Sequence, residues 1–442
     1  MKVAFKTLGC KLNYSETSSI SREFTKKGYL KVPFEESSDI YVINTCSVTQ
    51  NADKEFKYLV NKVKRKNPDS SVVAIGCYAQ LKPKEISNIQ GVDLVLGADK
   101  KFDILSYINL DKKDNNNIHS CEINSVDFFK NSYSLGDRTR SFLKVQDGCD
   151  YKCTYCTIPR ARGKSRSGKV SELIGNAKYL VSKGVKEIVL TGVNIGDYGI
   201  FDVKTKKRES SFLELISNIN LISDLDRVRI SSIEPNLLTD EIIQFVYLSN
   251  NFVRHFHIPL QSGSDKILKL MKRRYLRKLY ETRVEKIKEL MPDCCIGVDV
   301  IVGFPGETDD DFIETYNFLK NLDISYLHVF SYSERDNTAS LHIKQKVPKK
   351  VRAQRSQILR KLSNEKKKFF YLSNLNQSRP VLFESKNNDG YIYGYTDNYI
   401  RVKTIWSKSL VDKIVECKLL ELDNDLVVKA KSFQNESIAL HQ

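Results

Sequence analysis

The sequence lacks any long run of apolar residues. No stretch approaches the roughly 18 consecutive apolar residues that a membrane-spanning helix needs, which excludes such a span. The first residues run into Gly9 and Cys10 without the apolar core of a secretory signal peptide. Both absences predict a cytosolic protein. Disulfides are then not expected, because that compartment keeps thiols reduced.

Acidic residues are outnumbered by basic ones. The 442 residues include 54 Asp and Glu against 71 Lys and Arg, which gives a net charge of +17. Such an excess favours a polyanionic partner, either nucleic acid or an anionic membrane, and the missing membrane segment favours nucleic acid. Hydrophobic residues make up 41% of the chain. That is enough for packed cores and excludes a disordered chain.

The first hundred residues alternate short apolar runs with helical patterns. Strands are predicted at residues 3–8, 40–44 and 72–75, and helices at residues 16–27 and 54–66. This alternation indicates an α/β domain with a parallel, Rossmann-like sheet and helices on its faces. The polar stretch at residues 111–117 cannot pack, and it is predicted to be a linker or a surface loop.

A second, longer alternation runs from about residue 141 to residue 330. It predicts strands at residues 142–146, 187–190, 227–230, 256–258, 296–302 and 326–330. The pair Thr308 and Asp311 offers a capping box for the helix between the last two strands. Six β/α units favour a full or partial barrel. An ordinary doubly wound sheet fits the same pattern.

The pattern changes again towards the C-terminus. Residues 344–370 hold 11 Lys or Arg and one acidic residue, Glu365. Short alternating runs then predict strands at residues 380–383, 391–395, 399–403, 415–420 and 425–430. They indicate a small all-β barrel or sandwich. Together the three patterns predict domains at residues 1–115, 135–370 and 371–438.

The run Cys149-x-x-x-Cys153-x-x-Cys156 is the strongest local signal among the ten cysteines. Thiolates are soft ligands that suit iron–sulfur clusters or zinc. Three ligands leave a four-iron cluster one cysteine short, with one iron open, whereas zinc normally takes a fourth ligand. The nearest histidine, His119, is 30 residues upstream. The run therefore predicts a cluster, placed on the active face of a barrel because it follows a strand.

Three further cysteines share a context although they lie far apart in the sequence. Cys10, Cys46 and Cys77 each follow the end of an apolar strand run. Since the carboxyl ends of parallel strands meet at one edge, we expect these thiols to converge there and to hold a second cluster. Buried core cysteines are the common alternative, and that reading is kept for the remaining four, Cys121, Cys294, Cys295 and Cys417.

The cysteine motif, with Tyr155 before its last cysteine, resembles the signature of the radical S-adenosylmethionine superfamily. The surrounding stretches narrow the resemblance to the methylthiotransferases; they are residues 146–163, 190–196, 231–235, 257–265 and 299–308. The N-terminal three-cysteine domain also matches that family. The C-terminal β module resembles the TRAM domain of RNA-modifying enzymes. The similarity covers nearly the whole chain in the family's order.

The resemblance implies two [4Fe–4S] clusters, on Cys149, Cys153 and Cys156 and on Cys10, Cys46 and Cys77. It implies S-adenosylmethionine both as the radical source and as the methyl donor, with an unidentified sulfur donor and electron donor. We predict contacts to S-adenosylmethionine at Gly192, Glu234 and Gly303, which lie near predicted strand ends. A salt-bridged structural carboxylate is the alternative for Glu234.

The family's subgroups act on isopentenyladenosine in tRNA, on a ribosomal protein, or on N6-threonylcarbamoyladenosine in tRNA. Residues 7–17, 144–147 and 163–167 look most like the third subgroup. This implies a transferase of sulfur-containing groups that methylthiolates carbon 2 of that nucleoside at position 37, next to the anticodon. The other two substrates remain alternatives. A non-enzymatic RNA-binding protein with structural zinc is the alternative of another class.

RNA binding has support from the residues themselves. Residues 138–169 hold nine basic side chains against Asp147 and Asp150, and a second basic stretch covers residues 344–370. Basic side chains bind phosphates independently of sequence. Aromatic residues of the β module can stack on loop bases; the candidates are Tyr391, Tyr393, Tyr395 and Tyr399.

Overall fold

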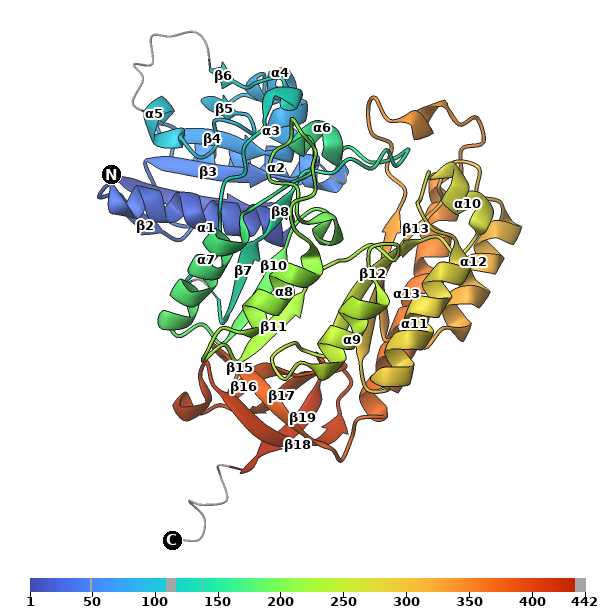
Figure 1. Cartoon of the computed structure of the whole chain (residues 1–442). Helices are drawn as coiled ribbons and strands as arrows, with labels where there is room; N and C mark the ends of the chain where they lie inside the picture. Colours follow the sequence, from blue (N-terminus) through green and yellow to red (C-terminus); the bar gives the residue numbers. More distant parts are fainter. Residues whose placement is uncertain (48–49, 109–116, 137, 434–442) are drawn as a thin grey trace.

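The structure, a computed structural model, describes residues 1–47, 50–108, 117–136 and 138–433. Residues 111–116 of the predicted linker and residues 434–438 of the predicted third domain lie outside this range. Figure 1 shows three parts: an α/β module at the top, an open arc of strands backed by helices in the middle, and a small β-barrel at the bottom. In the described ranges no helix is long and apolar enough to cross a membrane.

The N-terminal module is a six-stranded parallel sheet in the order β2-β1-β3-β4-β5-β6. Its strands are β1 (Lys2–Thr7), β2 (Leu30–Val32), β3 (Ile40–Thr45), β4 (Ser71–Gly76), β5 (Leu94–Leu96) and β6 (Ile118–His119). Its helices are α1 (Lys11–Lys26), α2 (Gln50–Lys66), α3 (Cys77–Leu81), α4 (Pro83–Ser87) and α5 (Ile104–Ile108). The predicted strands and both helices are therefore confirmed. The short strands β2, β5 and β6 were not anticipated.

The middle part is an arc of six parallel strands. They are β7 (Arg140–Lys144), β10 (Glu187–Thr191), β11 (Arg227–Ile230), β12 (His255–Gln261), β13 (Cys295–Val302) and β14 (Tyr326–Ser331). Two three-stranded halves meet at bridges between Val228 and Phe252 and between Ser232 and His257. Each strand lies beside the next one along the chain. A doubly wound sheet reverses its strand order, so the partial barrel is confirmed.

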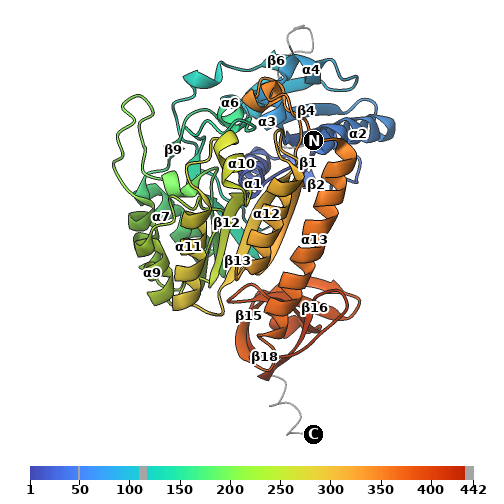
Figure 2. The same cartoon turned by 90° about the vertical axis from the view of Figure 1, so that its right-hand side faces the viewer.

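Helices cover the outer face of this arc (Figure 2). They are α7 (Val170–Ser182), α8 (Phe212–Asn220), α9 (Asp240–Leu248), α10 (Asp265–Leu270), α11 (Arg277–Leu290) and α12 (Asp309–Asn321). The predicted capping box of α12 is present, since Thr308 and Asp311 bond reciprocally. A small hairpin of β8 (Gln146–Asp147) and β9 (Arg166–Ser167) flanks α6 (Ile158–Arg162).

The C-terminal part is a closed five-stranded barrel, reached through the long helix α13 (Lys349–Leu372). Its strands are β15 (Ser378–Asn388), β16 (Tyr391–Thr396), β17 (Arg401–Ile405), β18 (Ile414–Leu422) and β19 (Val428–Ser432). Phe370 and Tyr371 of α13 pack in its core. The small all-β module is thus confirmed. Its core extends back into α13 as far as Phe370, one residue before the predicted start of the third domain at residue 371.

Polar contacts dock the C-terminal barrel firmly onto the arc. Arg227 donates hydrogen bonds to the carbonyls of Pro380 (2.6 Å) and Tyr395 (3.0 Å). The Tyr399 hydroxyl donates to Glu187 of β10 at 2.6 Å. The barrel therefore closes the amino-terminal end of the arc, and its position is set by buried groups on both sides.

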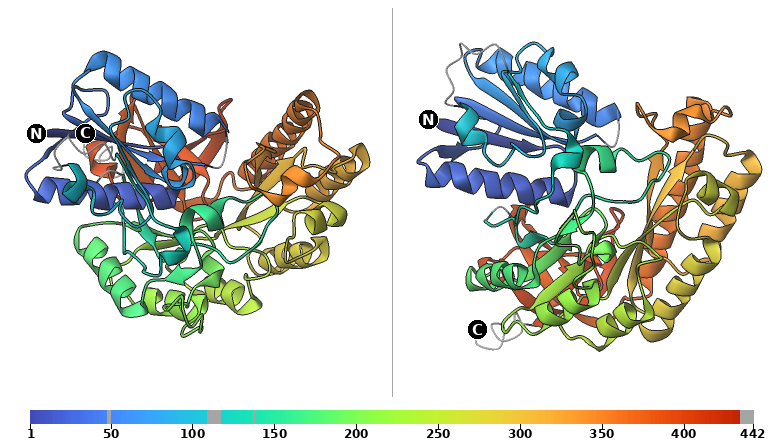
Figure 3. Two further views of the ribbon diagram at one scale, coloured as in Figure 1. Left: turned by 90° about the horizontal axis from the view of Figure 1, so that it is seen from above. Right: turned by 45° about the horizontal axis from the view of Figure 1, so that its top comes forward.

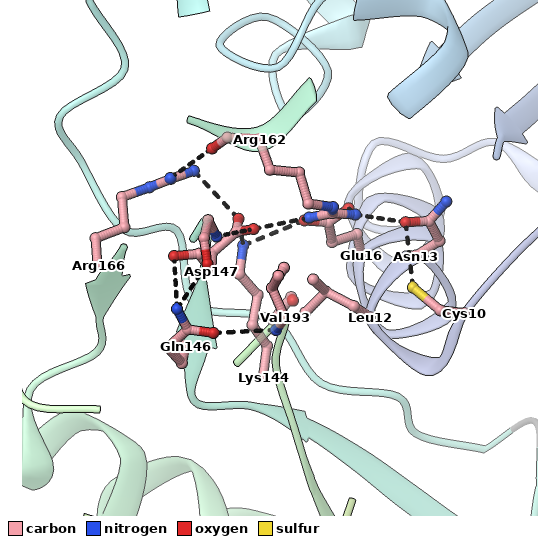
Figure 4. Close-up of polar contacts among 12 residues, drawn as sticks. Cys10, Leu12, Asn13, Glu16, Lys144, Gln146, Asp147, Arg162, Arg166 and Val193 are labelled. Carbon is pink, nitrogen blue, oxygen red and sulfur yellow. Dashed lines mark hydrogen bonds and ion pairs between the residues drawn. The ribbon is translucent and has the colours of Figure 1, made fainter. Parts of the chain in front are cut away.

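Figure 3 shows the N-terminal module beside the β7 end of the arc, and a buried ion network joins the two parts (Figure 4). Glu16 of α1 has no exposed side-chain surface, and its carboxylate lies 2.7 Å from Lys101, 3.2 Å from Lys144 and 3.1 Å from Arg162. The second carboxylate belongs to Asp147, which pairs with Lys144, Arg162 and Arg166. Burial opposes ionisation of Glu16, but these cations outweigh it and hold its pKa well below the usual range.

Replacing Glu16 with Gln should strongly destabilise this interface, because it leaves buried cations without their carboxylate. Breaking one partner of a buried pair costs about 3–5 kcal/mol. We expect a loss of that size in the unfolding transition of the N-terminal module, measured in urea at pH 7. Since the folded pKa is lowered, the Glu16 contribution is complete above the ordinary glutamate pKa and is lost only as the pH falls towards the folded value.

Glu23→Gln is the matched control on the same helix. Glu23 forms an exposed pair with Lys26 at 2.8 Å, and exposed pairs contribute about 0–1 kcal/mol. Equal losses for the two substitutions would show that the buried network does not hold the modules together.

Candidate functional site

The structure places Cys10, Cys46 and Cys77 at one edge of the N-terminal sheet, after the neighbouring strands β1, β3 and β4. Cys10 is exposed, Cys46 is half-buried and Cys77 is buried. Gly9 has φ +144°, and a Cβ there would lie 3.2 Å from the Cβ of Cys46. The backbone at Gly9 therefore packs directly against Cys46, where a side chain would be crowded.

Positive charge is concentrated beside these thiols. The Cys10 thiol donates to the Asn13 side-chain oxygen at 3.7 Å, and Asn13 accepts a second hydrogen bond from Arg162 (Figure 4). The ion network behind them has two carboxylates and four cations; the cations are Lys101, Lys144, Arg162 and Arg166. Burial raises the pKa of Cys77, and Arg162 opposes that effect. A buried excess of cations suits a group held by thiolates.

Cys149, Cys153 and Cys156 lie together on the loop between β8 and α6, and all three are half-buried. Burial raises the pKa of Cys149 and of Cys156 to about 12, so bare thiols there stay protonated at neutral pH. A metal charge converts such thiols to thiolates. Arg273, which is 4% exposed, donates to the Cys153 sulfur at 3.2 Å. The donor set fits a metal group that supplies its own positive charge.

The spacing of the sulfurs separates a cluster from a single ion. Two Zn–S bonds of about 2.3 Å place the sulfurs of a zinc site at most about 4.6 Å apart. Among the described residues, no three cysteine sulfurs lie within 4.8 Å of one another. Neither cysteine group is therefore arranged as a preformed site for one zinc ion.

A cavity of about 240 Å³ opens beside Cys156 at the carboxyl ends of β12, β13 and β14. Gln261, Asp299 and Tyr332 line it, together with Tyr155 and Arg335. None of these was predicted as a site residue. Gln261 and Asp299 stand in the stretches that carry the family resemblance, and their places near the ends of buried strands could have singled them out.

Asp299 anchors two imidazoles at this end of the arc. Its carboxylate lies 2.9 Å from His257 Nε2 and 3.3 Å from His328 Nδ1. Burial opposes its ionisation, but the two histidines outweigh that effect and lower the pKa of Asp299. Asp299 is therefore a carboxylate that fixes both rings.

The predicted S-adenosylmethionine contacts lie at strand ends, and none of them lines the cavity beside Cys156. Gly192 follows β10, where a Cβ would meet the Gln146 carbonyl oxygen at 2.9 Å. Gly303 follows β13 with φ +74° and donates its N–H to Glu307 at 2.8 Å. Glu234 forms an ion pair with Arg273. Each of the three residues thus has a structural role in the fold. Their contacts to S-adenosylmethionine remain a prediction.

Part of the predicted phosphate-binding charge is internal. Lys144, Arg162 and Arg166 belong to the buried network, and in α13 Arg352 and Arg355 pair with Glu334 and Glu307 at 2.6 Å each. The two basic stretches therefore serve the fold as well as the surface. Of the four remaining cysteines, Cys294, Cys295 and Cys417 are buried as expected, and Cys121 is half-buried.

Comparison with known proteins agrees with this layout. Residues 143–319 match the radical SAM superfamily, and residues 2–97 match uncharacterized protein family UPF0004. The Bacillus subtilis threonylcarbamoyladenosine tRNA methylthiotransferase MtaB is 39% identical over 95% of this chain and 94% of its own length. The tRNA-2-methylthio-N(6)-dimethylallyladenosine synthase of Clostridium botulinum is 32% identical over 95% of this chain and 94% of its own.

A solved structure shares the fold at low sequence similarity. It is the radical S-adenosylmethionine methyltransferase TsrM from Kitasatospora setae, with a TM-score of 0.54 and 13% identity over 75% of this chain and 74% of that one. The sheet-edge cysteines, the cysteine loop of the arc and the similarity along nearly the full length point the same way. The chain belongs to the radical S-adenosylmethionine methylthiotransferase family.

Proposed function

We propose that the chain methylthiolates carbon 2 of N6-threonylcarbamoyladenosine at position 37 of tRNA. The observation that carries this proposal is the 39% identity, over 95% of the chain, to a relative named for that activity. The relative named for dimethylallyladenosine matches at 32%, so isopentenyladenosine is the second candidate. The ribosomal-protein alternative has no such support, and family membership contradicts the non-enzymatic alternative.

Two cofactor sites follow from the cysteines. Cys149, Cys153 and Cys156 would hold one [4Fe–4S] cluster, and Cys10, Cys46 and Cys77 the other, with S-adenosylmethionine beside the first. When bound, these groups supply the radical and sulfur chemistry that an adenine carbon, neither acidic nor electrophilic, requires. Gly192, Glu234 and Gly303 are kept as candidate contacts to S-adenosylmethionine. Sulfur donor and electron donor remain to be identified.

The chain's own residues orient and shield this site. Arg273 joins three groups, since it bonds to Cys153, to Glu234 and, at 3.4 Å, to the Tyr155 hydroxyl. Tyr155 packs edge-on against Phe304 at 6.2 Å between ring centroids. The loop is thereby fixed and partly shielded from water, a condition for controlling a radical species.

The domains take separate roles in this proposal. Residues 1–115 carry the sulfur-handling cysteines, residues 135–370 the radical chemistry, and residues 371–438 form a TRAM-like RNA-binding module. Tyr391 is 40% exposed, which supports stacking on tRNA bases, whereas Arg401 lies over the Tyr393 ring. Tyr395 and Tyr399 pack on each other with 5.0 Å between their ring centroids. A tRNA substrate accords with action in the cytosol.

Deleting the gene from its host should remove 2-methylthio-N6-threonylcarbamoyladenosine from bulk tRNA and leave the unmethylthiolated nucleoside in its place. Mass spectrometry of tRNA nucleosides measures both, and a plasmid copy of the gene serves as the control. Loss of the 2-methylthio derivative of isopentenyladenosine instead would contradict the proposed substrate and favour the second candidate.

Replacing Cys149, Cys153 and Cys156 together with Ala should abolish formation of 5′-deoxyadenosine. The substitution removes all three anchors, and metal affinity depends on the ligands present. The assay is chromatography of 5′-deoxyadenosine after anaerobic reduction, with the buried-cysteine variant Cys417→Ala as the control. Continued cleavage of S-adenosylmethionine in the triple variant would refute the ligand assignment.

Replacing Cys10, Cys46 and Cys77 together with Ala should halve the iron content, because thiolates are the expected ligands of both clusters. The variant should still form 5′-deoxyadenosine but transfer no methylthio group to tRNA. Iron analysis and nucleoside mass spectrometry test the two parts. An unchanged iron content would show that these are core cysteines.

A further inference from the structure

A second cavity lies between the arc, α13 and the C-terminal barrel. Its volume is about 470 Å³, within the roughly 300–1,000 Å³ typical of small-ligand sites. Every part of the molecule contributes to its wall: Lys11 comes from α1, Arg229 from β11, Lys367 from α13, and Tyr399 and Arg401 from the C-terminal barrel. The cavity is therefore formed only when the three parts are assembled.

The charge on the wall has one sign. Four cationic side chains line the cavity, namely Lys11, Arg229, Lys367 and Arg401, and no carboxylate of the described residues does. Tyrosine side chains make up much of the remaining surface. Such a wall selects an anionic group carried on a planar or apolar body.

Two of the cations have unused hydrogen-bonding capacity. In the described part of the chain, no hydrogen bond or ion pair engages the Lys11 ammonium. Arg229 is only 8% exposed, and its Nε is buried without a hydrogen-bond partner. The nearest carboxylate to that atom is Glu187 at 3.8 Å, and Glu187 already accepts the Tyr399 hydroxyl at 2.6 Å.

The Arg229 guanidinium is held in place by stacking. Its central carbon lies 4.1 Å from the centre of the Tyr399 ring. The ring covers one face of the guanidinium, and the edge that carries the N–H donors stays available. A guanidinium edge binds a carboxylate through two parallel hydrogen bonds. A buried, oriented and incompletely satisfied arginine is the expected form of a carboxylate-binding group.

Single residues link the cavity to each of the two proposed cluster sites. Lys11 directly follows Cys10 in the sequence. His328 lines this cavity and bonds to Asp299, which lines the other cavity beside Cys156. A nucleoside whose adenine lies between the two cysteine groups can therefore extend a substituent into the cationic cavity.

We propose that this cavity binds the carboxylate of the threonylcarbamoyl substituent, with Arg229 and Lys11 as its specificity-determining partners. The inference rests on the proposed function. The threonylcarbamoyl group ends in a carboxylate, whereas the isopentenyl group is an uncharged hydrocarbon. An isopentenyl group would bring no acceptor for Lys11 or for the available edge of Arg229, and that penalty selects against it.

The test measures binding as well as turnover. Anticodon stem-loop RNAs carry N6-threonylcarbamoyladenosine, its carboxamide analogue or isopentenyladenosine at the target position. Reconstituted wild-type protein should bind the carboxylate RNA about 10- to 100-fold more tightly than the carboxamide RNA, as expected for charge-assisted hydrogen bonds. Arg229→Gln and Lys11→Gln should each reduce that ratio, and the double variant should bring it close to one.

Lys368→Gln is the matched control, an exposed lysine of α13 that does not line the cavity. This substitution should weaken the binding of all three RNAs alike and leave the preference for carboxylate over carboxamide RNA unchanged. Lys11→Gln serves as the second variant if Arg229→Gln does not fold. A carboxylate preference that survives in folded Lys11 and Arg229 variants overturns the inference, as does its absence from wild-type protein.

The same assay separates this inference from the proposed function. Wild-type protein that methylthiolates threonylcarbamoyl RNA without preferring the carboxylate refutes the cavity assignment and leaves the function intact. Wild-type protein that methylthiolates only isopentenyl RNA refutes the function itself.

Discussion

The buried pairing of Glu16 and Asp147 with their four cations is the constraint on which the rest of the structure depends. Its members come from α1, β7, β8, α6, β9 and the connection between β5 and α5. The sheet-edge cysteines and the cysteine loop of the arc are therefore both positioned by one set of charges. Buried charges tolerate little displacement, because each separation leaves an ion without compensation. Chemistry shared between the two cysteine groups, as proposed, requires such a fixed relationship.

Much of the architecture could be predicted from the sequence. The strands of the arc alternate regularly with helices, so residues 227–230 and 296–302 were placed almost to the residue. The threefold recurrence of cysteine after a strand run located Cys10, Cys46 and Cys77 at one edge. Local sequence patterns were enough for this prediction, because in a parallel sheet the strand direction alone decides which strand ends lie together.

The features that the sequence did not reveal depend on tertiary contacts. Strands β5 and β6 are too short to show a period, and they form only against a neighbour already in place. Basic runs predict solvated faces, yet Arg162 and Arg355 pair internally with acids far away in the sequence. The cationic cavity is likewise absent from any local pattern, since Lys11, Arg229 and Tyr399 come from three separate parts of the chain.

The docking of the C-terminal barrel sets the distance between two parts of the protein that an RNA would have to contact. Arg227 and Tyr399 hold the barrel against the arc, so the distance from the exposed Tyr391 to the sheet-edge cysteines is set by the protein alone. An RNA that binds the barrel, as the proposed function expects, would then have to bring its target nucleotide to the cysteines across this set distance. Position along the strand would be selected by length, and the identity of the base by shape and charge.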